Sequence, residues 1–75
     1  MQIIFFGKLV DITGSSTLTV PDVSDTHALI QQLHQQFPAL ASIKYAIAVD
    51  KKMTSENMPL QPHTTVALLP PFSGG

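Results

Sequence analysis

The residues best suited to chemistry lie together at the end of the chain, where residues 70–75 read Pro-Pro-Phe-Ser-Gly-Gly. Gly74 and Gly75 have no side chains, so they can enter a channel too narrow for any other residue. A carboxylate on Gly75 is inert toward nucleophiles until it is activated, for instance as an acyl-adenylate made from ATP. The activated group can then become a thioester, an isopeptide or a thiocarboxylate. We therefore predict that the chain supplies a substrate carboxylate on Gly75 and that a partner supplies the catalytic groups.

The four residues before the glycines would present them to that partner. Two successive prolines, Pro70 and Pro71, restrict φ and favour an extended exit from the preceding element. Phe72 offers an aromatic anchor, and Ser73 is small. A frayed terminus or a cloning remnant is the alternative, and a Gly-Gly pair alone is a weak signal. The whole pattern directly after an apolar strand is much stronger, so we expect an extended tail over residues 70–75.

Composition narrows the class of protein. The 75 residues make one small domain over residues 1–75, and a hydrophobic fraction of 44% requires a packed core. There is no cysteine, so no disulfide or thiolate metal site can stabilise the chain. Four Lys+Arg against five Asp+Glu give a net charge of -1 without a basic patch, which argues against nucleic-acid binding. No apolar run approaches the roughly 20 residues that span a bilayer, and the N-terminus lacks the features of a signal peptide. We expect a cytoplasmic protein that binds no membrane.

Hydrophobic periodicity predicts an α+β domain. Four strands are expected, over residues 2–6, 16–20, 45–49 and 65–69. Asp25 is a good N-cap for a helix over about 26–36, with apolar residues on one side and glutamines on the other. Residues 8–13 suggest a short helical turn or a loop, and a short edge strand is expected around residues 58–60. These elements can bury the helix in one way, as one sheet with the helix across one side.

The other face of this sheet is expected to be apolar as well. Side chains alternate between faces along a strand. The sets that contain Gln2 in the first strand and Thr65 in the last are the better candidates for the uncovered face. They leave four apolar residues partly exposed near the root of the tail, namely Ile4, Phe6, Ala67 and Leu69. Exposed apolar patches usually mark interaction sites, so we interpret this face, with residues 70–73, as a partner-binding surface. The alternative is that residues 8–13 or a loop cover it.

The sequence resembles the MoaD/ThiS family of ubiquitin-like sulfur carriers over the whole chain. The matching residues are Phe5-Phe6-Gly7, Gly14, Leu29, Leu33, Ala48-Val49 and 66–75. The ending from Leu69 is similar to the Phe-Pro-Pro-Val-x-Gly-Gly that is typical of the MoaD branch, the small subunits of molybdopterin synthase. Carriers of the thiamin pathway share the Gly-Gly but usually lack the Pro-Pro. The chain departs from the family at Lys8-Leu9-Val10-Asp11, where an Arg-Glu pair is frequent, at Asp50, where Asn is common, and at Phe72, where a smaller residue is usual.

The resemblance implies a β-grasp fold, with a mixed sheet of four to five strands and one main helix across one face. It implies that a MoeB-type activating enzyme uses ATP to adenylate the Gly75 carboxylate, which then becomes a thiocarboxylate. The tail would enter the active site of a MoaE-type large synthase subunit, where sulfur is given to precursor Z to form the dithiolene of molybdopterin. The chain would be non-catalytic alone and would bind no permanent cofactor.

Two alternative functions stay open. One is a ThiS-like carrier that delivers sulfur to the thiazole of thiamin. The other is a ubiquitin-like modifier or binding module that transfers no sulfur.

The histidines do not suggest a metal site. His27 and His34 are seven residues apart on the predicted helix, which places them about 10 Å apart and too far to share one metal. We therefore expect no metal site and interpret both as a solvated helix flank.

Overall fold

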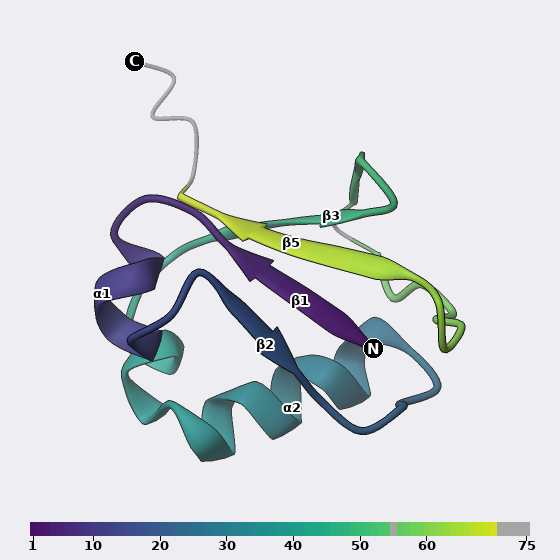
Figure 1. Cartoon of the computed structure of the whole chain (residues 1–75), viewed down its shortest axis with the longest axis horizontal. Coiled ribbons are helices and arrows are strands. Elements are labelled where there is room, and N and C mark those ends of the chain that lie inside the picture. Colours follow the sequence, from purple (N-terminus) through teal and green to yellow (C-terminus); the bar gives the residue numbers. More distant parts are fainter. Residues whose placement is uncertain (55, 71–75) are drawn as a thin grey trace.

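The computed structural model describes residues 1–54 and 56–70 of the chain. Within these ranges a five-stranded sheet is covered on one face by one main helix (Figure 1). The elements follow the order β1 (Gln2–Phe5), α1 (Leu9–Thr13), β2 (Thr17–Thr19), α2 (Thr26–Gln36), the 3-10 helix η1 (Pro38–Ser42), β3 (Ala46–Val49), β4 (Lys52–Thr54) and β5 (Thr65–Leu69). The four strands and the main helix predicted from periodicity are confirmed.

The sheet is mixed, as expected. Its strand order is β2-β1-β5-β3-β4 in the described part of the chain. The central strands β1 and β5 are parallel, with Ile3 beside Val66, whereas the other neighbouring strands are antiparallel. A parallel pair needs a long crossover connection, and here α2, β3 and β4 all lie between the two strands in sequence. Because β1 and β5 run in the same direction, both end at the same end of the sheet, where Pro70 follows.

The core lies between the sheet and α2. Its fully buried side chains include Ile3, Leu29, Leu33, Val66 and Leu68, and Phe5 is only 2% exposed. The ring of Phe5 meets that of Phe37 edge to face, with 6.4 Å between centroids. Buried residues alternate with exposed or half-buried ones along β1 and with half-buried ones along β5, as a sheet with one covered face requires. The predicted assignment of inward and outward sets in these two strands is therefore confirmed.

Side chains from two distant segments cap the start of α2. Asp25 Oδ1 accepts a hydrogen bond from the backbone N–H of Ala28 at 2.9 Å, which confirms the predicted N-cap. Asn57 Oδ1 accepts from the N–H of His27 at 2.9 Å and from the hydroxyl of Thr26 at 3.0 Å. Thr26 is 2% exposed, so these bonds satisfy a polar group inside the protein. The cap thereby ties α2 to the loop that precedes β5.

The edge strand predicted around residues 58–60 is wrong. The edge strand is β4, which pairs with β3 through the two-residue turn Asp50-Lys51. Both turn residues have positive φ, 47° for Asp50 and 72° for Lys51. Such turns match the twist of a tight hairpin and usually contain Asn-Gly, so this turn carries a weak sequence signal. Pro59 forms only an isolated bridge with Asp25, because a proline has no N–H to continue a ladder.

The other helices are short. Residues 8–13, for which the sequence suggests a helical turn or a loop, contain α1, which ends at Gly14 with a φ of 80°. Leu9 of α1 is fully buried in the core. The 3-10 helix η1 was not predicted, and its Leu40 is also fully buried. None of the helices in residues 1–54 and 56–70 is long and apolar enough to cross a membrane.

Candidate functional site

Strand β5 leads directly to the root of the tail. Pro70 follows Leu69 and is partly buried. It lies against Gly7, because a Cβ atom built on Gly7 would be 2.7 Å from Cγ of Pro70. The predicted site residues Pro71, Phe72, Ser73, Gly74 and Gly75 lie outside the described residues. Their roles therefore stay predictions, and the site described below consists of the tail root and the sheet face beside it.

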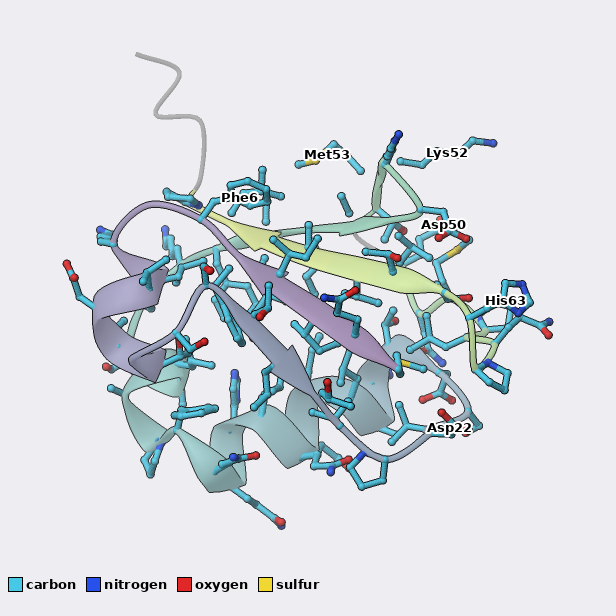
Figure 2. All side chains as sticks on the ribbon, viewed as in Figure 1. Phe6, Asp22, Asp50, Lys52, Met53 and His63 are labelled. Atoms are coloured by element: carbon cyan, nitrogen blue, oxygen red, sulfur yellow. The ribbon has the colours of Figure 1, made fainter. Side chains whose placement is uncertain are left out.

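The four apolar residues predicted on the uncovered face lie there. Ile4, Ala67 and Leu69 are half-buried, and Phe6 is 45% exposed. Figure 2 shows Phe6 on the side of the sheet away from α2. The alternative in which residues 8–13 cover this face is not what the structure shows, since Leu9 of α1 packs into the core and leaves Phe6 open. Their role in binding a partner remains a prediction.

A row of paired residues crosses this face from β1 to β4. Ile4 pairs with Ala67, Ala67 pairs with Ala48, and Ala48 pairs with Met53. Directly paired residues project to the same side of a sheet, so two alanines lie between the larger side chains of Ile4 and Met53. Met53 is 52% exposed. Met53 is not among the residues predicted for this face; the alternation of sides across a β3–β4 hairpin is the signal that would have found it.

A groove of about 340 Å³ occupies part of this face. It is lined by Ile4, Phe6, Asp50, Lys51, Thr65 and Ala67. Its charged rim is held in place because Asp50 Oδ1 accepts from the N–H of Thr65 at 3.0 Å, and the N–H of Asp50 donates to the Thr65 carbonyl at 2.9 Å. An asparagine could accept the first of these bonds equally well, so the departure at Asp50 preserves the local structure. The groove can hold an apolar side chain of a partner, and Lys51 is one of its lining residues.

A second, more open hollow of about 660 Å³ lies at the β3–β4 edge of the sheet. It is lined by Ile30, Tyr45, Ala46, Ile47, Met53 and Thr54. Nearby, His34 Nε2 and the Tyr45 hydroxyl are 2.7 Å apart and share a hydrogen bond, and burial raises the pKa of Tyr45. His34 is thus partly buried and paired, so the interpretation of His34 as a solvated flank is wrong, whereas His27 is exposed.

The topology defines the class of protein. A mixed sheet with parallel central strands and one helix across a single face is the β-grasp fold of ubiquitin-like proteins, as expected. The solution structure of the small archaeal modifier protein 1 from Methanosarcina acetivorans has the same fold, with a TM-score of 0.85 over 99% of this chain and 94% of that one. Only 17% of the residues are identical, so this likeness concerns the fold alone.

Sequence comparison identifies the family within that class. The model of the ThiS family matches residues 3–75, and the chain belongs to this family. The molybdopterin synthase sulfur carrier subunit of Homo sapiens is 30% identical over 100% of this chain and 93% of its own length. The protein of the same description from Arabidopsis thaliana is 27% identical over 100% of this chain and 82% of its own. The predicted membership of the MoaD/ThiS family is confirmed.

Proposed function

We propose that this chain is the sulfur carrier subunit of a molybdopterin synthase. The observation that carries the proposal is the likeness along the whole chain to two proteins described as molybdopterin synthase sulfur carrier subunits. The site supports it, because an apolar face leads along β5 to Pro70 and then to a Gly-Gly sequence. The Pro70-Pro71 pair favours this function over thiazole synthesis.

In the proposed reaction Gly75 is the residue that changes. A carboxylate oxygen of Gly75 attacks the α-phosphorus of ATP in a MoeB-type activating enzyme, which releases pyrophosphate and leaves an acyl-adenylate. A sulfur donor then displaces AMP and converts the acyl group to a thiocarboxylate. In a MoaE-type large subunit, the thiocarboxylate sulfur forms a bond to carbon of precursor Z, and water then cleaves the acyl C–S bond and returns the Gly75 carboxylate. Two such transfers, each from a loaded carrier, complete the dithiolene. This chain contributes the carrier, whereas ATP and the acid–base groups belong to its partners.

The uncovered face has the properties that this role requires. A carrier must dock on its partner before its tail can reach the active site, and apolar patches supply most of the favourable energy of docking. Ile4, Phe6 and Ala67 line the groove, and Leu69 continues the same face toward the tail root. The exposed aromatic ring of Phe6 is the best candidate for an anchor, because aromatic residues dominate the energetics of interfaces.

Intact mass spectrometry tests the proposal. The full chain is incubated with a MoeB-type enzyme, ATP and a sulfur donor, and its mass is expected to rise by the difference between one sulfur atom and one oxygen atom. A variant that lacks Gly74 and Gly75 is the matched control and should keep its mass. Adding a MoaE-type subunit and precursor Z to the loaded chain should then yield molybdopterin.

Three results would contradict the proposal in different ways. An unchanged mass would exclude a sulfur carrier. A loaded chain that supplies a thiazole synthase but not a MoaE-type subunit would assign it to thiamin synthesis. Recovery of Gly75 joined to lysine side chains of other proteins, without any thiocarboxylate, would identify a ubiquitin-like modifier.

A further inference from the structure

We propose that Gly7 is a positioning residue for the tail, because its missing side chain forms the seat for Pro70. Seating Pro70 sets the direction in which the chain leaves β5 and therefore where the Gly75 carboxylate can be delivered. The inference rests on the proposed function, since it concerns presentation of the same carboxylate. It adds a role for a residue that lies outside the tail and that no part of the carrier chemistry requires.

The contact between Gly7 and Pro70 leaves no room for a side chain. A Cβ atom on Gly7 would lie 2.7 Å from Cγ and 3.4 Å from Cδ of Pro70. Carbon atoms in contact are normally about 3.5–4.0 Å apart, so any other residue at position 7 would force one of the two segments to move. Gly7 also has a φ of 59°, a backbone conformation that L side chains rarely adopt. Both space and backbone geometry therefore call for glycine here.

The two sides of this contact are held firmly by the rest of the domain. The N–H of Phe6 donates to the Leu68 carbonyl at 3.1 Å, which continues the pairing of β1 with β5 up to the contact. The Gly7 carbonyl accepts from the N–H of Val10 at 3.1 Å and so belongs to the first turn of α1. Leu9 of α1 is fully buried. The seat is thus attached to the folded domain through β1 and α1, although Gly7 itself is exposed, and Pro70 lies partly buried against it.

The distance between seat and reacting group makes the direction of the root important. Residues 71–75 carry the chain from Pro70 to the carboxylate, a reach of at most about 18 Å for a fully extended chain. Leu69 of the uncovered face and Pro70 of the root are adjacent, so a partner that holds the face receives the tail from a fixed starting point. A displacement of about 1 Å at a reacting centre can lower a rate by about a hundredfold.

The structure offers a matched control for Gly7 in Gly14. Gly14 also has a positive φ, 80°, but a Cβ atom there would meet nothing within 4 Å. Gly7→Val and Gly14→Val therefore introduce the same side chain into comparable backbone strain, and only the first meets Pro70. We expect Gly7→Val to lower kcat for adenylation about tenfold relative to Gly14→Val. The KM for the carrier should change less than about threefold, since the docking face is intact.

The rate is measured as ATP–pyrophosphate exchange by a MoeB-type enzyme with each full-length variant. Pro70→Ala removes Cγ and Cδ of the ring. Adding Gly7→Val to that variant should therefore lower kcat for adenylation by less than about threefold. If Gly7→Val lowers kcat equally with and without the Pro70 ring, the inference is overturned. Gly7→Ala, which adds only the clashing Cβ, is the milder variant for the same cycle if the valine variant does not fold.

Nuclear magnetic resonance separates this inference from the proposed function. In the free wild-type chain, a nuclear Overhauser effect is expected between the Gly7 Hα protons and the Pro70 Hγ protons, and it should persist in Gly14→Val. Absence of this signal would refute the seat whether or not the chain is adenylated. Conversely, a seated wild-type chain that supports no exchange would refute the proposed function, whereas an adenylated chain with equal rates for the two valine variants would refute the positioning role alone.

Discussion

The two faces of the sheet are both apolar but differ in how deeply their side chains are buried. On the covered face, Ile3, Val66 and Leu68 are fully buried beneath α2. On the uncovered face, the alternating neighbours Ile4 and Ala67 remain half-buried, and Phe6 is 45% exposed. The difference teaches that apolar content alone does not identify a core. One face contributes the stability of the domain, and the other, which no described element covers, is the proposed partner-binding face.

The largest effect is expected from truncation on the covered side. Leu33 is fully buried in α2, so Leu33→Ala should lower the free energy of unfolding by about 2–5 kcal/mol. This is a large share of the about 5–15 kcal/mol that holds a typical domain together. Urea unfolding followed by circular dichroism measures it. Gln35→Ala on the exposed side of the same helix is the control and should change stability by about 0.5 kcal/mol or less; equal losses would contradict the described core.

A change on the uncovered face should act on binding instead. Phe6→Ser is expected to weaken binding to a MoaE-type subunit by about 2 kcal/mol, as loss of an aromatic anchor does. The free energy of unfolding should fall by about 1 kcal/mol or less, because Phe6 is 45% exposed. Isothermal titration calorimetry and urea unfolding give the two numbers. Gln2→Ser, at the far end of β1 on the same face, should leave affinity unchanged, and similar losses from both variants would argue against a localised docking site.

The attachment of the covering helix should weaken in acid. The hydrogen bond from the N–H of Ala28 holds the pKa of the Asp25 carboxyl below its ordinary value, with a smaller contribution from the Asn57 side chain. Because the pKa is lower in the folded state, the carboxylate stabilises the fold above about pH 4, and this contribution is lost as the pH falls through the folded-state pKa. The urea midpoint of wild type should therefore decline more steeply from about pH 5 to about pH 3 than that of Asp25→Asn. If the urea midpoints of the two proteins decline in parallel, ionisation of Asp25 does not stabilise the fold.

The smallest effect is expected at the rim of the uncovered face. Lys51 has a φ of 72°, a conformation that costs a residue with a side chain about 1–2 kcal/mol. Glycine relieves this strain but loses more entropy on folding, so Lys51→Gly should raise the free energy of unfolding by about 0.5 kcal/mol. Lys52→Gly makes the same change in charge within β4 and should lower it by a similar amount. If both variants lose stability in urea, strain at the turn is not a significant term.

Much of the fold could be predicted because its signals are local. Alternation along residues 2–6 and 65–69 identified both faces, and Asp25 marked the start of α2. The edge strand was misplaced because Asp50-Lys51 lacks the glycine that usually marks a two-residue turn. The second cap on α2 was missed for another reason, since Asn57 lies 30 residues from His27 and only the folded chain brings them together.

The candidate site could be predicted only in part. The apolar residues of β1 and β5 follow from alternation, but Met53 joins them only once β4 is paired with β3. The seat of Pro70 on Gly7 depends on the parallel register of β1 with β5, which no local pattern specifies. The sequence shows a glycine after the first strand and a proline after the last. Only the parallel pairing of β1 with β5 brings these two residues into contact.

The central place of β5 also has a meaning for synthesis. Ribosomes make residues 65–69 after every other strand described above, yet these residues form the middle of the sheet between β1 and β3. A nascent chain that is stopped early has a gap at its centre and no pairing partner for the inner edge of β1. Loops closed over such long sequence separations form late. A chain interrupted before residue 65 therefore lacks the central strand of the sheet and, with it, the root of the tail.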